Sequence, residues 1–423
     1  MNRYFVSRCC LTKYFLLLTL LAVGIVSSEA QNEIKISGSV VDDSSSYAVA
    51  FASISYNGTG TLTDINGRFS LTISVLNKSD SILVSCIGYE NKLIPVRSFE
   101  SGSEQTVTLS QKIYELSPHD IPGLSSGKIV ETAIGKIPEV FAADTFYQQG
   151  FYRQYHQENQ EYVRLIEAVL TVESRVEKNK KSVKSKERVS IHQLRRSDNN
   201  EKNKEEHGDH LMDLLEENPV YHSTGTLLNL KALQLYRFYF DPKSAGSDSV
   251  YHIFYYSTDR SGDRYDRGEI FIDVIDFTIL KFTKEEIKNN YALRKPRYSS
   301  EAPYRWEFLI STLAVEYRMI KGKMHTSSLM KTYTHELYDN KVQTKEFLVT
   351  EYFELTIQNV IEQERIQHGK DFSVFSNLYH RKYIYDASFW SKYPFPDFYF
   401  AKPENVMGDL KKNRTMDEQF RSN

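Results

Sequence analysis

Two ionisable residues stand inside very apolar segments of this chain. Arg153 lies within FYRQY and Glu167 lies within RLIEAVL. Both segments have the aromatic and aliphatic composition of buried strands, where a carboxylate is costly to bury unless it is paired or protonated. Two kinds of chemistry would fit this pattern. Arg153 and Glu167 could form a partly buried ion pair that fixes strand register, or Glu167 could act as a catalytic acid. We favour the ion pair.

The turn between the two segments decides whether the residues can meet. His156 to Glu161 is polar, so we expect an antiparallel hairpin there. Arg153 and Glu167 each lie seven positions from Gln160, and a turn centred on Gln160 would set them directly opposite each other. A turn centred on Glu158 would instead place Arg153 opposite Val163. Register is therefore the assumption on which the predicted pair depends.

The histidines offer a second kind of chemistry. His207 and His210, with Glu206, Asp209 and Asp213 nearby, could suggest a metal, but nothing in their spacing fixes a ligand count. The alternative is the exposed start of a helix. None of the 11 histidines is followed three residues later by Glu, and the segment His335 to Asp339 lacks the second histidine of a zinc protease motif. We therefore predict no metal site.

Sequence motifs of catalysis and cofactor binding are also missing. The chain has no G-x-S-x-G, P-loop, strand-linked G-x-G-x-x-G, C-x-x-C or EF-hand pattern. Counting carboxylates leaves a glycosidase-like acid/base pair open. We predict no catalytic residue and no cofactor.

The elements that would position Arg153 and Glu167 belong to a large β-rich domain, residues 129–423. Strands are expected at 146–172, 188–196, 236–240, 250–256, 268–282, 306–320, 324–333 and 345–355, with a short helix at 128–138. Lys321-Gly322-Lys323 and Tyr338-Asp339-Asn340 suit hairpin turns. The sum predicts an antiparallel meander or half-barrel with one or two helices. Charged residues predict a loop near 178–209.

A smaller domain is expected at 32–112, followed by a linker at 113–128. Six short strand patterns are separated by turns, as in a β-sandwich. Thr63 to Gly67 reads as a tight turn in which Gly67 would adopt a positive φ.

The segments ISGSVVD, AVAFASISYNGTGTLTDINGRFSL and SCIGYENKLIPV resemble the carboxypeptidase-regulatory-like domain of Bacteroidota envelope proteins. The same module precedes the plug of many TonB-dependent polysaccharide transporters. The resemblance implies a seven-stranded immunoglobulin- or transthyretin-like sandwich without peptidase chemistry. A weaker resemblance to uncharacterised β-rich Bacteroidota domains rests on Phe151-Tyr152-Arg153, Glu167-Ala168-Val169, Gly268 to Asp273 and Phe389-Trp390, and it implies architecture only.

Residues 1–30 read as a secretory signal peptide. Arg3, Arg8 and Lys13 precede an apolar run, and Ser28-Glu29-Ala30 predicts cleavage before Gln31. A retained anchor is the alternative. Cleavage would leave Cys86 as the single cysteine, which excludes an intrachain disulfide.

A net charge of −2 without a basic stripe argues against binding of nucleic acid. The sequence has no second long apolar run, so we expect no transmembrane helix after the signal peptide.

The sequence thus favours a non-catalytic exported protein at the periplasmic face of the outer membrane. Its partner could be another envelope protein or an outer-membrane transporter, with a link to polysaccharide uptake, and its ligand is not identified. The first alternative is a carrier of lipid or another apolar ligand in a curved sheet. The second is a hydrolase of glycans or peptides.

Overall fold

The computed structural model describes most of the chain from residue 32 onward. The described residues are 32–43, 46, 48–49, 52–56, 59–63, 67–75, 80–86, 89–99, 104–110, 125–179, 182–198, 211–223, 226–240, 249–259, 262–288, 304–339, 341, 344–361, 373, 378–396, 398–412 and 414–421. The expected signal peptide, its cleavage site and most of the expected linker lie outside them.

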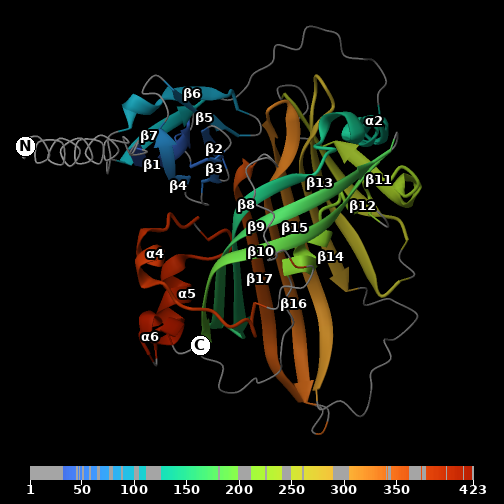
Figure 1. The fold of residues 1–423 in the computed structure, drawn as a ribbon. Helices are drawn as coiled ribbons and strands as arrows, with labels where there is room; N and C mark the ends of the chain where they lie inside the picture. Colours follow the sequence, from blue (N-terminus) through green and yellow to red (C-terminus); the bar gives the residue numbers. More distant parts are fainter. Residues whose placement is uncertain are drawn as a thin grey trace, which may run out of the picture.

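The N-terminal domain is a sandwich of two sheets (Figure 1). One sheet has the order β4-β1-β7 and the other β3-β2-β5-β6, and β1 pairs with β7 in parallel. Ile36, Ile54 and Val84 are among its fully buried core residues. The seven strands that the resemblance implies are confirmed within the described residues, one more than the six strand patterns predicted. Their bounds are β1 Asn32–Asp42, β2 Ser53–Tyr56, β3 Thr59–Leu62, β4 Arg68–Val75, β5 Ser81–Ser85, β6 Lys92–Pro95 and β7 Glu104–Leu109.

Gly67 fixes the turn that precedes β4. Its φ is +74°, as predicted, and its carbonyl accepts a hydrogen bond from the Val40 amide at 2.7 Å. A Cβ added at this position would lie 2.4 Å from the Val40 carbonyl oxygen. Residues 64–66 of the predicted turn lie outside the described ranges. Glycine is required here both for the left-handed backbone and for the close approach.

The second domain is built on one ten-stranded antiparallel sheet, which confirms the predicted fold class. Its order is β10-β9-β8-β17-β16-β15-β14-β13-β12-β11. The chain therefore forms two meanders, β8–β10 and β11–β17, which join where β8 pairs with β17. The bounds are β8 Phe146–Glu158, β9 Glu161–Lys178, β10 Val183–Asp198, β11 Tyr236–Phe240, β12 Val250–Ser257, β13 Arg264–Asp273, β14 Ile279–Lys288, β15 Tyr304–Ile320, β16 Lys323–Asp339 and β17 Thr344–Ile361.

A bulge sets the register of the β8–β9 hairpin. The turn itself is Asn159-Gln160, with Asn159 at a φ of 55° and Glu158 opposite Glu161. The pairing then shifts between His156 and Gln157, so that His156 lies opposite Arg164. The extra residue in β9 is Val163, and beyond it the hairpin is centred on Gln160.

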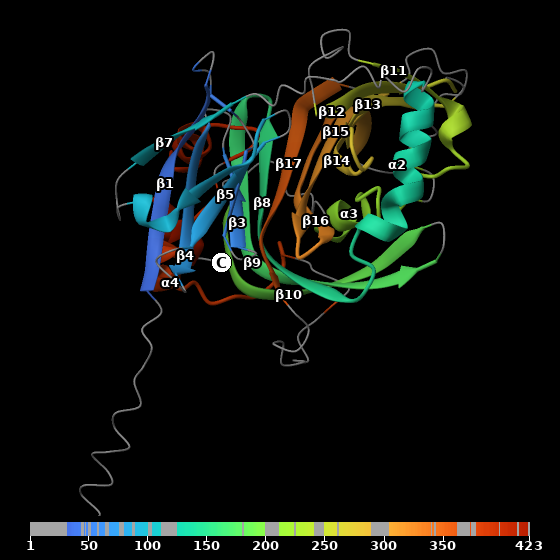
Figure 2. The same ribbon diagram turned by 90° about the horizontal axis from the view of Figure 1, so that it is seen from above.

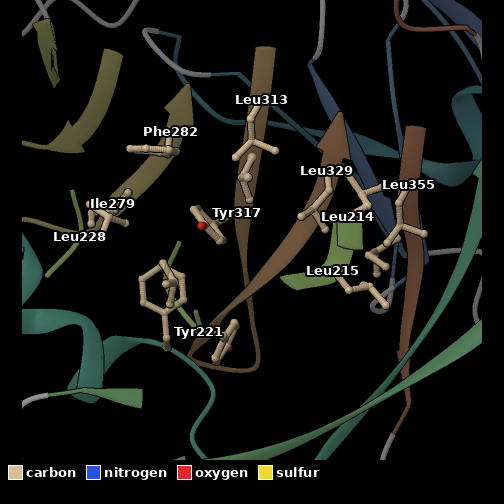
Figure 3. Packing of buried hydrophobic residues seen from close by; sticks show 14 of the residues in the cluster. Leu214, Leu215, Tyr221, Leu228, Ile279, Phe282, Leu313, Tyr317, Leu329 and Leu355 are labelled. Carbon is tan, nitrogen blue, oxygen red and sulfur yellow. The ribbon is translucent and has the colours of Figure 1, made fainter. Parts of the chain in front are cut away.

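The sheet curves around two helices. Figure 2 shows α2, Ser126–Val140, and α3, Leu211–Glu216, inside the curve. Buried side chains from α3 and the segment after it, including Leu214, Leu215 and Tyr221, pack against Leu329 and Leu355 of the sheet (Figure 3). The concave face is thus filled by the chain's own residues over this area.

The opposite, convex face is covered by two other parts of the chain. The N-terminal sandwich and the C-terminal helices lie on this side of β8 and β17 (Figures 1 and 2). Gly60 in β3 approaches Arg318 so closely that a Cβ there would lie 2.1 Å from Arg318 Nη1. The helices are α4 Ala387–Lys392, α5 Pro403–Leu410 and α6 Met416–Arg421. No helix within the described ranges is both long enough and apolar enough to cross a membrane.

Residues 183–198 form β10, which confirms the strand expected at 188–196 and corrects the loop predicted near 178–209 at residues 183–187, 197 and 198. Lys184 and Lys186 are exposed and alternate with buried Val183 and Ser185. The two lysines therefore lie on the outer face of a strand, in which side chains alternate between buried and exposed. The number of charged residues in a segment does not show this alternation.

Two other expectations differ in detail. The strand expected at 268–282 is two strands, because Asp273 Oδ1 accepts from the Ile275 and Asp276 amides and turns the chain. The described residues hold five α-helices where one or two were expected, and four of them have only six to eight residues, too short for a clear period. The longest, α2, begins at Ser126, inside the expected linker.

Two identical substitutions at glycines should have opposite effects. Gly67→Ala should lower the free energy of unfolding by roughly 1–3 kcal/mol, because the new Cβ meets the Val40 carbonyl at a positive φ. Gly135→Ala should raise it by about 0.5–1 kcal/mol, because Gly135 is an exposed residue inside α2 with open space around it. Thermal unfolding of both variants measures this. Equal effects would show that Gly67 is not under backbone constraint.

Candidate functional site

Arg153 and Glu167 lie directly opposite each other on β8 and β9, and they are 2% and 0% exposed. Arg153 Nε donates to Glu167 Oε1 at 2.9 Å. The row continues on both sides with residues that the sequence analysis did not single out. Arg195 of β10 lies opposite Glu167, and Glu354 of β17 lies opposite Arg153. We call Arg195, Glu167, Arg153 and Glu354 the charge ladder.

Every carboxylate oxygen of the charge ladder accepts a hydrogen bond. Arg195 Nε donates to Glu167 Oε2 at 2.6 Å, and Arg153 Nη1 donates to Glu354 Oε2 at 3.1 Å. Glu354 Oε1 accepts from the Tyr155 hydroxyl at 2.7 Å. Two cations and two anions alternate across four strands, so the buried charges compensate one another.

A segment near the C-terminus closes over the charge ladder. This strap, residues 387–396 and 398–400, bonds to the ladder through its backbone. The Pro396 carbonyl accepts from Arg153 Nη2 at 2.9 Å, and the amides of Tyr399 and Phe400 donate to Glu354 Oε1 at 2.9 and 3.3 Å.

The strap also places aromatic rings over both arginines. The Arg153 guanidinium carbon lies 3.7 Å from the Phe398 ring centroid, and that of Arg195 lies 4.6 Å from Trp390 and 4.4 Å from Phe395. Such cation–π contacts add about 0.5–2 kcal/mol each, most where water is excluded. The strap is therefore held by hydrogen bonds, rings and buried charge together.

The pKa values of the two carboxyl groups shift in opposite directions. Burial alone would raise the pKa of Glu167, but Arg195 and Arg153 outweigh it and hold that pKa below its usual value. At Glu354 burial is the largest influence and raises the pKa despite Arg153 and Tyr155. A raised carboxyl pKa is a common feature of catalytic acids. Here the carboxyl group is 3% exposed and fully hydrogen-bonded, so its geometry fits a structural clamp.

A serine, a glutamate and a histidine meet at the edge of the concave interior. Ser185 Oγ donates to Glu187 Oε1, while His222 Nε2 lies 2.9 Å from Glu187 Oε2 and 3.4 Å from Ser185 Oγ. In a catalytic triad the histidine uses one nitrogen for the serine and the other for the acid. One nitrogen of His222 faces both partners here, and the serine hydroxyl donates its hydrogen bond to the carboxylate and not to the histidine. The arrangement ties the segment after α3 to β10.

A third group of charges holds the C-terminal end of α3 to the sheet. Glu217 lies 2.6 Å from Lys331 Nζ and 3.4 Å from Lys284 Nζ. Burial alone would raise the pKa of Glu217, but the two lysines outweigh it and lower that pKa. Glu217 is thus an ionised anchor.

The convex face of β11–β13 carries a row of aromatic side chains. The rings of Tyr239 and Phe254 stack with centroids 5.5 Å apart, and those of His252 and Phe271 stack at 4.2 Å. Tyr239 is 48% exposed and Tyr256 is 38% exposed. We call Tyr239, His252, Phe254, Tyr256 and Phe271 the aromatic row. Within the row, His252 Nε2 lies 2.9 Å from Glu269 Oε2, and beside it Arg267 Nε forms an ion pair with Glu285 Oε2 at 2.7 Å.

The structure does not test the metal hypothesis at His207 and His210. Both residues, with Glu206 and Asp209, lie outside the described ranges, and Asp213 falls in α3. Within the part of the chain that the structure describes, no three His, Cys, Asp or Glu side chains gather closely enough to hold a metal.

Coupling between Arg153 and Glu167 can be measured with a double-mutant cycle. Arg153→Met should lower the free energy of unfolding by roughly 3–5 kcal/mol, because it leaves buried carboxylates uncompensated. Together with Glu167→Gln, the cycle should give a coupling energy of about 1–3 kcal/mol.

The matched control is the exposed pair Lys128–Glu131, whose side chains are 58% and 48% exposed. Its coupling, measured with Lys128→Met and Glu131→Gln, should be no more than about 0.5 kcal/mol. Additive effects at Arg153 and Glu167 would contradict the ion pair.

Comparison with known proteins bears mainly on the N-terminal domain. A search of curated proteins finds no match. A structure of lipovitellin with its lipid–protein interactions matches at 8% identity and a TM-score of 0.23, covering 63% of this chain and 30% of that one. An acyl-CoA hydrolase from Agrobacterium tumefaciens matches at 8% identity and a TM-score of 0.09, covering 29% of this chain and 74% of that one. Neither likeness carries an argument about function.

The family model of the CarboxypepD_reg-like domain matches residues 36–118. The match includes β2 to β7 and most of β1. The N-terminal sandwich of this chain is thus similar to a CarboxypepD_reg-like domain over residues 36–118.

Proposed function

We propose that this chain is a non-catalytic exported protein that binds an envelope partner or ligand at the periplasmic face of the outer membrane. In this proposal the aromatic row on β11–β13 is the contact surface. The CarboxypepD_reg-like domain supports a regulatory or spacer role for the N-terminal sandwich. The apolar run of residues 14–26 supports export.

The single observation that carries the proposal is the exposure of stacked aromatic rings on a regular sheet face. Tyr239 and Tyr256 expose 48% and 38% of their surface, whereas other parts of the sheet are covered by the chain itself. Aromatic side chains are enriched in binding interfaces and carry much of their binding free energy. The paired charges around the row favour recognition by ring contact over recognition by net charge.

An envelope protein or an outer-membrane transporter is the partner that we propose, with a role in nutrient uptake, including polysaccharide uptake. This part rests on the resemblance of the N-terminal domain to modules of such systems. The aromatic row and this partner class are separate parts of the proposal, and the experiment below tests both.

A carrier of lipid or another apolar ligand is less well supported. Such a carrier needs an apolar cavity of several hundred Å³. The concave face instead packs against α2, α3 and the segment after α3, as Figure 3 shows for Leu214, Leu215 and Tyr221. A hydrolase is also less well supported, because Ser185, Glu187 and His222 do not share their hydrogen bonds as a catalytic triad does.

The experiment is photo-crosslinking in the native host. A photoreactive residue at position 239 should crosslink to an envelope protein in the membrane fraction. Tyr239→Ala with Phe254→Ala should reduce recovery of that protein about 10-fold or more, a loss of about 1.4 kcal/mol.

Position 384 supplies the control, because Ile384 is 91% exposed and lies outside β11–β13, in the segment before α4. Ile384→Ala should leave recovery unchanged, and a photoreactive residue there should not give the same product. Cytoplasmic location of the full chain, or equal crosslinking from both positions, would contradict the proposal.

A further inference from the structure

A small polar cavity lies where the β8–β10 side of the sheet meets β16 and the segment after α3. It measures about 10 Å³. Its polar lining comes from Gln148 of β8, Ser174 of β9, Glu187 of β10, Asn218 after α3, and Thr326 of β16. These side chains are between 3% and 8% exposed. Polar groups from four strands thus converge inside an otherwise apolar core.

Two lining atoms have unused hydrogen-bonding capacity. Gln148 Nε2 donates to the Thr326 carbonyl at 3.1 Å, which leaves Gln148 Oε1 for another donor. No hydrogen bond joins Ser174 Oγ to another described residue, and Ser174 lies directly opposite Glu187 on the neighbouring strand. Burying such groups without partners costs about 1–3 kcal/mol each.

The other lining groups are already occupied. Asn218 Nδ2 donates to Thr326 Oγ1 at 2.9 Å, and Asn218 Oδ1 accepts from the Tyr317 hydroxyl at 3.0 Å. Glu187 accepts from Ser185 and contacts His222. The open positions therefore face the cavity from Gln148, Ser174 and the remaining lone pairs of Glu187.

We infer that this cavity binds one water molecule, which donates to Gln148 Oε1 and Glu187 and accepts from the Ser174 hydroxyl. The volume is about that needed for one water, and a buried water typically makes two to four hydrogen bonds. A metal cation fits less well, because Glu187 is the single carboxylate in the lining and a hydroxyl donor faces the same space.

This water joins three strands beside the Ser185–Glu187–His222 group. It would hold Glu187 in place together with Ser185 and His222, and so stabilise the attachment of the segment after α3 to β10. The site is independent of the aromatic row and of the proposed function.

The stability test uses two isosteric variants of the full chain. Ser174→Thr and Ser174→Val add the same volume and are both β-branched, so they differ in the hydroxyl alone. A wet, polar site predicts that the valine variant melts below the threonine variant, by about 2 °C or more. A dry cavity predicts the reverse, because a methyl group then fills space without displacing a hydrogen-bonded molecule. An equal or higher melting temperature for Ser174→Val overturns the inference.

A crystal structure of the full chain, at a resolution that shows ordered water, identifies the occupant. The expected result is one density peak within hydrogen-bond distance of Ser174 Oγ and Gln148 Oε1. That peak should be absent in Ser174→Val. No peak in the unsubstituted protein overturns the inference. Five or more oxygens at about 2.4 Å around the peak would identify a cation and also overturn it.

Discussion

Four charged side chains lie in one row across β10, β9, β8 and β17, and their burial constrains the rest of the second domain. Each ion is costly to bury alone, and each is offset by the one opposite it on the next strand. A slip of one residue on any of these strands would turn its ladder residue to the other face. The charge ladder therefore requires one fixed register across four strands, although β17 is far in the sequence from β8, with which it pairs.

The same constraint reaches beyond the sheet. Arg153 and Glu354 bond to the Pro396 carbonyl and to the amides of Tyr399 and Phe400, so the compensation is complete only when the strap is in place. Much of the sheet's surface is covered by other parts of the chain. These are the strap, the N-terminal sandwich, and the helices α2 and α3 on the concave face. The aromatic row on β11–β13 remains open to solvent, which is why the proposed contact surface lies there.

Local features were predictable from the sequence, and features that depend on distant segments were not. Gly67 and the Arg153–Glu167 pairing follow from turn chemistry and from a hairpin whose partners are 14 positions apart. Arg195 lies two positions after Gln193, on the same face of the strand expected at 188–196, but the charged residues on both sides of that strand indicated a loop. Glu354 and Pro396 lie 201 and 243 positions from Arg153. The periodicity of apolar residues within one segment cannot predict contacts between segments so far apart. The short helices α4–α6 depend on the same kind of long-range packing.

The central claim is that the charge ladder joins the strap and the sheet into one cooperative unit. Native-state hydrogen exchange at the amides of Tyr399 and Phe400, which bond to Glu354, tests it most directly. The account predicts that these amides open with nearly the same free energy as the β8 and β9 amides, so that protection differs by less than about 10-fold. Exchange of the strap amides faster by about 1,000-fold or more would show that the strap opens by itself, and would contradict the account.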